Sequence, residues 1–300
     1  ERKKYRSMKS MNYRVTGASS GLGKALALGL AKTGATVTML CRDPHRGRKA
    51  RIDLIARSGN PNIDLMICDL SSLKDVRRFA EEFKSFYQEL HLLANLAGVY
   101  YPRHRRSPDG HEYNLAANVL GPFLLTNLLL DLMIESGPAQ IINVSGEGHR
   151  VGSLHLRDPD LNGNFSVYDA DNQAALARVI WTYELARRLR DTQVTANTFC
   201  PGRTRTRIYR HLPAPLRLPV NLWRRFFAQS PEKAMAPILE RVLDPHQADL
   251  SGEYYVKGKP ERSVPITYDR EVAAQLFAWC EEKTGRRCPV PAYSEVDWVH

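Results

Sequence analysis

Apolar residues follow two alternating patterns along the first two-thirds of the chain. Short runs rich in β-branched residues alternate with longer segments whose apolar positions recur at helical spacing, which is the pattern of βαβ units. The expected strands are residues 11–16, 36–41, 63–68, 91–95, 140–145, 194–199 and 253–256. The expected helices are approximately residues 21–33, 46–57, 73–87, 112–135, 170–190, 231–243 and 270–283. The sequence therefore predicts an α/β fold with a single doubly wound parallel sheet of about seven strands, flanked by helices.

Three features depart from this alternation. Residues 1–10 form a basic N-terminal arm, for which a solvated state is the first interpretation and contact with anionic lipid is the alternative. Residues 203–229 are rich in arginine, proline and aromatic side chains, and we expect them to leave the sheet as a lid over the substrate. Arg14 places a charge in the first expected strand that the pattern does not explain. No convincing linker or repeat divides the remainder, so residues 11–300 are expected to form a single domain.

Composition and charge exclude several classes of protein. The 300 residues carry 43 Lys and Arg against 32 Asp and Glu, a net charge of +11, and 43% of them are hydrophobic, which excludes a wholly disordered chain. No recognition helix, zinc module or RNP-like aromatic strand accompanies the arginine clusters, so we expect no nucleic-acid partner. Five widely spaced cysteines, with no metal-ligand spacing, indicate buried thiols and no metal site. Because no uninterrupted apolar run is long enough to span a bilayer, a cytoplasmic protein is expected.

A glycine-rich turn at residues 17–23 follows the first expected strand and opens the first expected helix. Glycines let the backbone approach a pyrophosphate closely, and the helix N-terminus offers unpaired N–H groups and a partial positive charge. In this context the run predicts a Rossmann-type dinucleotide site. The expected cofactor contacts in the turn are Gly17, Ser19, Ser20, Gly21, Leu22 and Gly23.

With this turn and the motifs after it, the sequence resembles the short-chain dehydrogenase/reductase family, in its retinol-dehydrogenase-like and protochlorophyllide-reductase-like branch, over roughly residues 11–285. The motifs that carry the resemblance are Cys68-Asp69-Leu70, Asn95-Leu96-Ala97-Gly98, Asn118, Asn143-Val144-Ser145 and Pro201-Gly202 with Thr206. The resemblance implies further cofactor contacts at Asp69, Leu70, Asn95, Ala97, Gly98, Pro201, Gly202 and Thr206.

The residues at the end of the second expected strand indicate which dinucleotide binds. An acidic residue there would bind a ribose 2′-hydroxyl and repel a 2′-phosphate, but the chain has Cys41-Arg42, with Arg46 and Arg48 close behind. A guanidinium suits a phosphate. We therefore predict NADP(H) rather than NAD(H), with Arg42 as a cofactor contact. The alternative for Arg46 and Arg48 is a solvated run of charges on a helix face.

The resemblance also implies a catalytic tyrosine, a lysine four residues later, a serine and a helix asparagine. The branch pattern Y-x-x-S-K-L-A, placed by the downstream run E-L-A-R-R-L, puts Asp171 at the tyrosine position and Ala175 at the lysine position. The family's N-V-S-S reads N-V-S-G here, so Gly146 stands at the serine position. Of the four, Asn118 alone is kept.

The candidate catalytic residues are Asn118, Tyr168 and Asp171. Pro122 lacks an N–H, so the carbonyl of Asn118 loses its helical partner and is free to hold a water; alternatively, Asn118 only maintains a helix kink. Tyr168, Asp171 and His149 are the candidate proton donors, although an aspartate donates only where an apolar site keeps it protonated. The alternatives are that Tyr168 is a packing aromatic and that Asp171 is a first-turn acid favourable to the helix dipole.

Three functions fit these residues. The preferred one is NADPH-dependent reduction of a small quinone-like or conjugated aromatic molecule, whose product anion needs little help from an acid. Its expected lid aromatics are Tyr100, Tyr101, Trp223, Phe226 and Phe227. The alternatives are a catalytically silent NADP(H)-binding protein or engineered inactive variant, and a non-redox cyclase or isomerase on the same fold. A homo-oligomer stays open, because the helix that usually forms the family's interface is the altered one.

Overall fold

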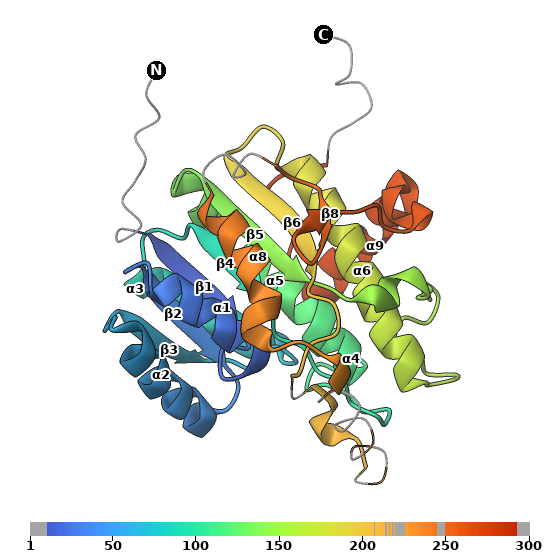
Figure 1. Cartoon of the computed structure of the whole chain (residues 1–300). Coiled ribbons are helices and arrows are strands. Elements are labelled where there is room, and N and C mark those ends of the chain that lie inside the picture. The colour runs from blue at the N-terminus through green and yellow to red at the C-terminus, as the bar shows by residue number, and fades with distance from the viewer. Residues whose placement is uncertain are drawn as a thin grey trace.

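The computed structural model describes residues 11–206, 208–213, 215, 217, 219, 226–244 and 250–292. In these residues eight strands form one sheet, in the order β3-β2-β1-β4-β5-β6-β7-β8 (Figure 1). The strands are β1 (Asn12–Thr16), β2 (Thr36–Cys41), β3 (Ile63–Ile67), β4 (Leu92–Asn95), β5 (Ala139–Val144), β6 (Val194–Cys200), β7 (Tyr254–Val256) and β8 (Lys259–Pro260). Neighbours are parallel from β3 to β7, and β8 pairs antiparallel with β7. The predicted doubly wound sheet is confirmed, with β8 as an added edge strand too short to produce a periodic pattern.

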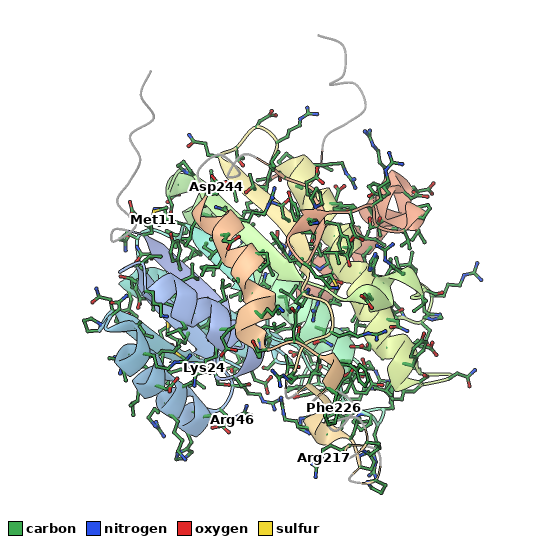
Figure 2. The ribbon with its side chains drawn as sticks, in the orientation of Figure 1. Met11, Lys24, Arg46, Arg217, Phe226 and Asp244 are labelled. Atoms are coloured by element: carbon green, nitrogen blue, oxygen red, sulfur yellow. The ribbon has the colours of Figure 1, made fainter. Side chains whose placement is uncertain are left out.

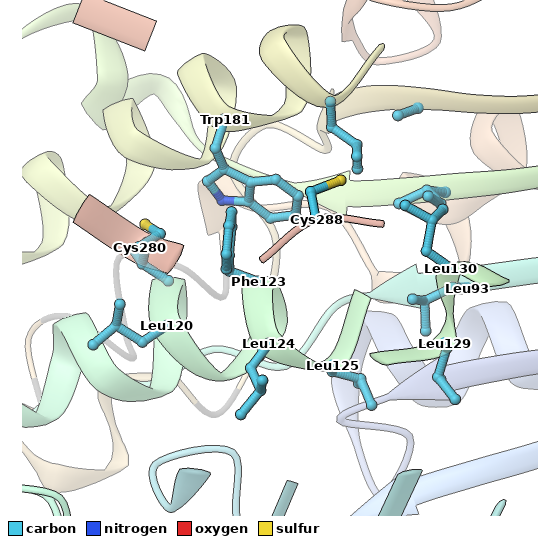
Figure 3. Packing of buried hydrophobic residues seen from close by; sticks show 14 of the residues in the cluster. Leu93, Leu120, Phe123, Leu124, Leu125, Leu129, Leu130, Trp181, Cys280 and Cys288 are labelled. Atoms are coloured by element: carbon cyan, nitrogen blue, oxygen red, sulfur yellow. The ribbon is translucent and has the colours of Figure 1, made fainter. Parts of the chain in front are cut away.

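Helices cover both faces of this sheet (Figure 1). On one face lie α1 (Gly21–Ala31), α2 (Pro44–Ser58) and α8 (Pro231–Leu243). On the other lie α3 (Leu73–Phe86), α5 (Gly121–Glu135), α6 (Val167–Arg188) and α9 (Arg270–Thr284). Aromatic rings join α5, α6 and α9. Phe123 lies 5.8 Å from Trp181, centroid to centroid (Figure 3). The ring of Phe277 lies 4.8 Å from that of Phe123. These edge-to-face contacts hold α6 against α5 and so fix the helix that forms one wall of the site described below.

The helix expected at residues 112–135 is interrupted. A short α4 (Tyr113–Leu115) leads into a π-helical turn, η2 (Ala116–Leu120), and only then into α5, because the Gly121 N–H bonds five residues back, to Ala116 O. Pro122 follows without an N–H, so Asn118 O is left without a helical donor. The stretch Tyr113–Glu135 is long and apolar enough to cross a membrane, but 83% of its most apolar window is buried inside the fold. In this fold the stretch packs in the hydrophobic core.

Arg14 is explained by its neighbours in space. It is fully buried in β1, and its guanidinium carbon lies 3.9 Å from the ring centroid of Phe79 and 4.0 Å from that of Phe83, both on α3. It also donates to Met66 Sδ at 3.7 Å. Burial lowers the pKa of Arg14 to about 9. Aromatic faces therefore stabilise a cation inside the apolar layer.

Two predictions about the whole chain have different outcomes. All five cysteines are free and buried, which confirms the predicted buried thiols. The basic arm of residues 1–10 lies outside the described residues, and the single domain over residues 11–300 stays a prediction.

Candidate functional site

A cavity of about 1220 Å³ opens where the central strands end. Residues that directly follow β1, β2, β3, β4, β5 and β6 all contribute to its wall. β1 and β4 are neighbours in the sheet although β2 and β3 separate them in the chain, so the strand order reverses at this point. Open α/β sheets bind their ligands in the crevice at such a switch point.

The glycine turn after β1 has the geometry of a phosphate cradle. Gly17 has a φ of +68°, and a Cβ added there would lie 2.9 Å from Ala97 Cα. A Cβ on Gly23 would lie 2.6 Å from Gly17 O. Ser20 precedes α1 without a side-chain cap, and the first turn of α1 holds no acidic residue. The first N–H groups and the positive end of the helix therefore face the cavity without competition from the protein, which fits a bound pyrophosphate.

Two arginines stand beside this turn. Arg42 donates to Tyr113 Oη at 2.5 Å, and Arg46 donates to Ser20 Oγ at 3.3 Å. Both line the cavity, whereas Arg48 contacts His45 at 3.4 Å on the exposed side of α2 and does not line it. Among the arginines that follow β2, Arg42 and Arg46 thus line the cavity beside the glycine turn. Figure 2 places Arg46 and the lid residue Phe226 along the same lower edge of the molecule.

The structure brings nearly all the predicted cofactor contacts into this one cavity. Its wall includes Gly17, Ser19, Ser20, Gly21, Leu22, Gly23, Arg42, Asp69, Leu70, Ala97, Gly98, Pro201, Gly202 and Thr206. Asn95 is the exception, because it is buried behind the wall and donates to Thr126 Oγ1 at 3.1 Å and Asn143 Oδ1 at 2.9 Å. The prediction that Asn95 contacts a cofactor is therefore corrected: its side chain ties β4 to β5 and α5.

One face of α6 forms the opposite wall. Tyr168, Asp171, Ala175 and Arg178 share this face at helical spacing, and all four line the cavity. Tyr168 is 58% exposed at the entrance, whereas Asp171 lies deeper. Burial raises the pKa of the Asp171 carboxyl to about 6, and the positive charge of Arg178 opposes that rise. Asp171 can therefore hold a proton near neutral pH.

Arg178 donates a hydrogen bond to the carbonyl of Asn118, which was expected to lack a helical donor. Its Nε donates to Asn118 O at 2.6 Å and its Nη1 donates to Val144 O at 2.6 Å. Asn118 O, expected to be free for a water, thus already accepts an N–H of the Arg178 guanidinium. The side chain of Asn118 is not only a kink residue, since it pairs with both the N–H and the carbonyl of Val99 at 2.9 Å.

Ser145 and His149 both form hydrogen bonds within the protein. Ser145 Oγ donates to Ala175 O at 2.8 Å, although the residue borders the cavity. His149 is fully buried; its Nδ1 lies 2.9 Å from Gly146 O and its ring lies 4.6 Å from that of Tyr254. Because His149 does not line the cavity, it is excluded as a proton donor to a ligand there. A Cβ added to Gly146 would have no atom closer than 4.0 Å.

Described residues of the segment 203–229 line the cavity, but with different side chains from those expected. Tyr209, in the turn Ile208–His211, packs edge-on against Tyr100 at 5.0 Å, and both line the cavity. Burial raises the pKa of Tyr100 to about 12, and the nearby charge of Asp171 adds to the rise. Tyr209 was missed because its short turn has no amphipathic pattern. The run of arginines around it was the available signal.

The other expected lid aromatics lie elsewhere. Tyr101 packs against Tyr113 and His211, with ring centroids 5.5 and 5.1 Å away, and is not part of the wall. Phe226 and Phe227 are 71% and 67% exposed. Trp223 lies outside the described residues. Of the five aromatics expected at the substrate end, the structure thus brings Tyr100 to the cavity.

Known proteins resemble this chain over most of its length. The family model for short chain dehydrogenases matches residues 13–216. Human retinol dehydrogenase 13 is 36% identical over 284 residues, or 92% of this chain and 85% of that protein, and human polyprenol dehydrogenase is 32% identical over 277 residues, or 90% and 84%.

Solved structures agree with this resemblance. A protein of Mycobacterium paratuberculosis described as uncharacterized superposes with a TM-score of 0.71 at 28% identity, covering 93% of this chain and 95% of that one. A short chain dehydrogenase from Shigella flexneri, solved with NADP, gives a TM-score of 0.66 at 21% identity, covering 84% and 99%, and supports the fold alone.

Proposed function

Because this chain belongs to the short-chain dehydrogenase family of oxidoreductases, we propose that it is an NADP(H)-dependent reductase of conjugated carbonyl compounds. The observation that carries the proposal is the continuous cavity of about 1220 Å³. One end has the glycine turn and two arginines, and the other has Asp171, Arg178 and Tyr100. A protein that only bound the nucleotide would not need this second end to stay open.

The residues at the first end fit NADP(H). The uncapped start of α1 and the tight approach at Gly17 suit a pyrophosphate, and Arg42 and Arg46 suit a 2′-phosphate. Asp69 lines the same end, where Ser71 holds it by bonds of 3.0 and 2.8 Å to Oδ1. When bound, the cofactor supplies a hydride from its nicotinamide ring.

At the second end, we take Asp171, Ala175 and Gly146 to stand at the family's tyrosine, lysine and serine positions. Asp171 then becomes the group that delivers a proton to the substrate oxygen, and the more exposed Tyr168 stands at the entrance. A general acid contributes roughly 10²–10⁴ in rate. An aspartate with a pKa of about 6 is only partly protonated at neutral pH, so the substrates that suit this site are those whose reduced oxygen tolerates negative charge.

Two relatives favour the same substrate class. They are named for retinol and polyprenol, which are allylic alcohols, so the corresponding aldehydes are conjugated enals. A quinone that gains a hydride gives a phenolate, and an enal that gains a hydride at its β-carbon gives an enolate, so in both the negative charge on oxygen is delocalised. We therefore place conjugated enals beside quinone-like molecules as candidate substrates of this chain.

A silent NADP(H)-binding protein is the second candidate, and specific contacts favour it. Ser145 Oγ is used on Ala175 O, and Asn118 O is used by Arg178, so two groups that border the cavity are satisfied within the protein. In that case the cavity binds the cofactor and a ligand without turnover.

Cofactor binding is tested by fluorescence titration of NADPH and NADH. NADPH is expected to bind more tightly, and Arg42→Asp to reverse the order, because a carboxylate repels the 2′-phosphate. Arg48→Asp is the matched control, since it makes the same charge change six residues later, on α2 and away from the cavity. Equal affinities for the two dinucleotides in the unmodified protein contradict the assignment.

Activity is tested by following NADPH oxidation with retinal, cinnamaldehyde, menadione and cyclohexanone. The proposal predicts turnover of the three conjugated compounds and none of cyclohexanone. Tight NADPH binding without oxidation by any of them supports the silent protein. A product that forms without NADPH oxidation supports a cyclase or isomerase.

A further inference from the structure

Arg178 is a cation held in place at the substrate end of the cavity. It lies three residues after Ala175 on the face of α6 that lines the cavity, and burial lowers its pKa to about 10, so it remains charged at neutral pH. Charged side chains are seldom placed in such a position unless something there uses the charge.

The two anchors of this side chain come from different elements. Asn118 O belongs to the π-helical turn before α5, where Pro122 has removed the competing N–H, and Val144 O ends β5. Bonds of 2.6 Å to both carbonyls use Nε and one N–H of Nη1. Two anchors on separate elements fix the guanidinium plane, and this geometry leaves the N–H groups of Nη2 for a ligand.

The charge of Arg178 is not neutralised by its partners. Both anchors are neutral carbonyls, and no carboxylate of the described chain forms an ion pair with it. Asp171 lies two turns earlier on the same face of α6, at a distance where it acts only through its charge. Tyr100, Tyr209 and Glu147 also line the cavity. A positive centre with open donors thus faces a space that can hold a ligand.

We propose that Arg178 is the oxyanion-binding residue of this site, and that it selects substrates whose reduced oxygen carries delocalised negative charge, such as an enolate or a phenolate. This inference rests on the proposed reductase function. It gives the guanidinium, which cannot donate a proton, the task of stabilising charge, and it gives Asp171 the separate task of supplying the proton.

The step balances for a conjugated carbonyl. The substrate's electrophilic carbon gains a hydride from bound NADPH, which becomes NADP⁺. The conjugated π electrons shift toward the carbonyl oxygen, which becomes an enolate or phenolate oxygen and lies against the Nη2 donors of Arg178. The Asp171 carboxyl transfers its proton to that oxygen and regains one from solvent. The substrate is reduced by two electrons, and the cofactor is oxidised by two.

The test uses a stable mimic of the anion, so it does not depend on turnover. 4-Nitrophenol, whose ionised form is coloured, is titrated into the protein saturated with NADP⁺. The variants are Arg178→Met, which removes the charge, and Arg178→Lys, which keeps it. Arg187→Met is the matched control, because Arg187 lies on the same helix and pairs with Glu184 outside the cavity.

We expect the unmodified protein to bind the phenolate and to lower the apparent pKa of the bound probe. Arg178→Met should weaken phenolate binding about ten- to hundredfold, the loss of one charge-assisted hydrogen bond, and abolish the pKa change. Arg178→Lys should keep part of both, and Arg187→Met should change neither. NADPH affinity should be unchanged in all variants, which also reports that each is folded.

Three results overturn the inference. Equal phenolate affinity in Arg178→Met and the unmodified protein would show that Arg178 does not bind the anion. Loss of NADPH affinity in Arg178→Met assigns the arginine to the cofactor. Binding of benzoate in place of 4-nitrophenolate, with the same dependence on Arg178, makes the residue a carboxylate anchor. If no carbonyl compound is reduced but the phenolate results hold, the proposed reductase function fails and the anion site stands.

Discussion

Replacing Asp171 with asparagine should stabilise the protein at neutral pH. Asparagine keeps the shape of the carboxyl but cannot ionise. Burial raises the pKa of Asp171 from 3.8 to about 6. That difference of about 2.2 pH units, at ~1.4 kcal/mol each, means that keeping the ionised carboxylate in the fold costs about 3 kcal/mol.

The sign of the effect follows from proton binding. The folded pKa lies above the unfolded one, so between about pH 4 and pH 6 the folded state holds more protons than the unfolded state. The free energy of unfolding therefore falls as the pH rises through this window. Below it the carboxyl is protonated in both states and costs nothing, and above it the full cost is present.

Urea denaturation of both proteins near pH 4 and near pH 7 measures this cost. We expect Asp171→Asn to be about as stable as the unmodified protein near pH 4 and more stable by up to about 3 kcal/mol near pH 7. Asp169→Asn is the matched control, because it makes the same change at an exposed acid in the same helical turn.

The same titration should appear in catalysis. If Asp171 supplies the proton, kcat for a conjugated carbonyl falls as the pH rises above about 6, and Asp171→Asn is slow at every pH. A variant that is equally stable relative to the unmodified protein at both pH values, or less stable near pH 7, would refute the burial of an ionisable carboxyl at this site.

Three further predictions concern other parts of the fold. Burial lowers the pKa of Arg14 from 12.5 to about 9, which corresponds to a cost of about 5 kcal/mol at neutral pH. Two ring contacts of up to ~2 kcal/mol each offset part of this cost. In urea at pH 7, Arg14→Met should therefore raise the free energy of unfolding by about 1–3 kcal/mol, and a decrease contradicts this. Gly23→Ala places a methyl group 2.6 Å from Gly17 O, so NADPH affinity by fluorescence should fall at least about tenfold, and unchanged affinity would show that the turn does not hold the cofactor. Gly146→Ser meets open space, so its urea midpoint should match that of the unmodified protein, and a clear loss of stability contradicts the open geometry.

The fold could be predicted from sequence because its signals are local. Each expected strand and helix has a counterpart, and 231–243 is matched residue for residue by α8, where Ser230 caps the helix and Pro231 begins it. The π-helical turn at Ala116–Leu120 was not predicted, because an apolar run has the same pattern with or without one inserted residue.

The parts of the site that could be predicted are those formed by residues close together in the chain. The glycine turn and Arg42 lie where expected, because strand, turn and helix are consecutive in the chain. Arg178 belongs to no motif, and its partners Asn118 and Val144 come from two other elements. Arg14 is similar, since Phe79 and Phe83 reach it only across the folded layer. Contacts between residues of different elements leave no regular spacing that a single sequence could reveal.

The most direct test of the reductase account is the fate of deuterium. The protein is incubated with NADPH deuterated at C4 of the nicotinamide and with cinnamaldehyde, and the products are analysed by mass spectrometry. The account predicts oxidised cofactor and 3-phenylpropanal that carries one deuterium at C3, where hydride addition leaves an enolate, with formation of both slowed in Asp171→Asn. NADPH that remains bound and unoxidised beside unchanged aldehyde would contradict it.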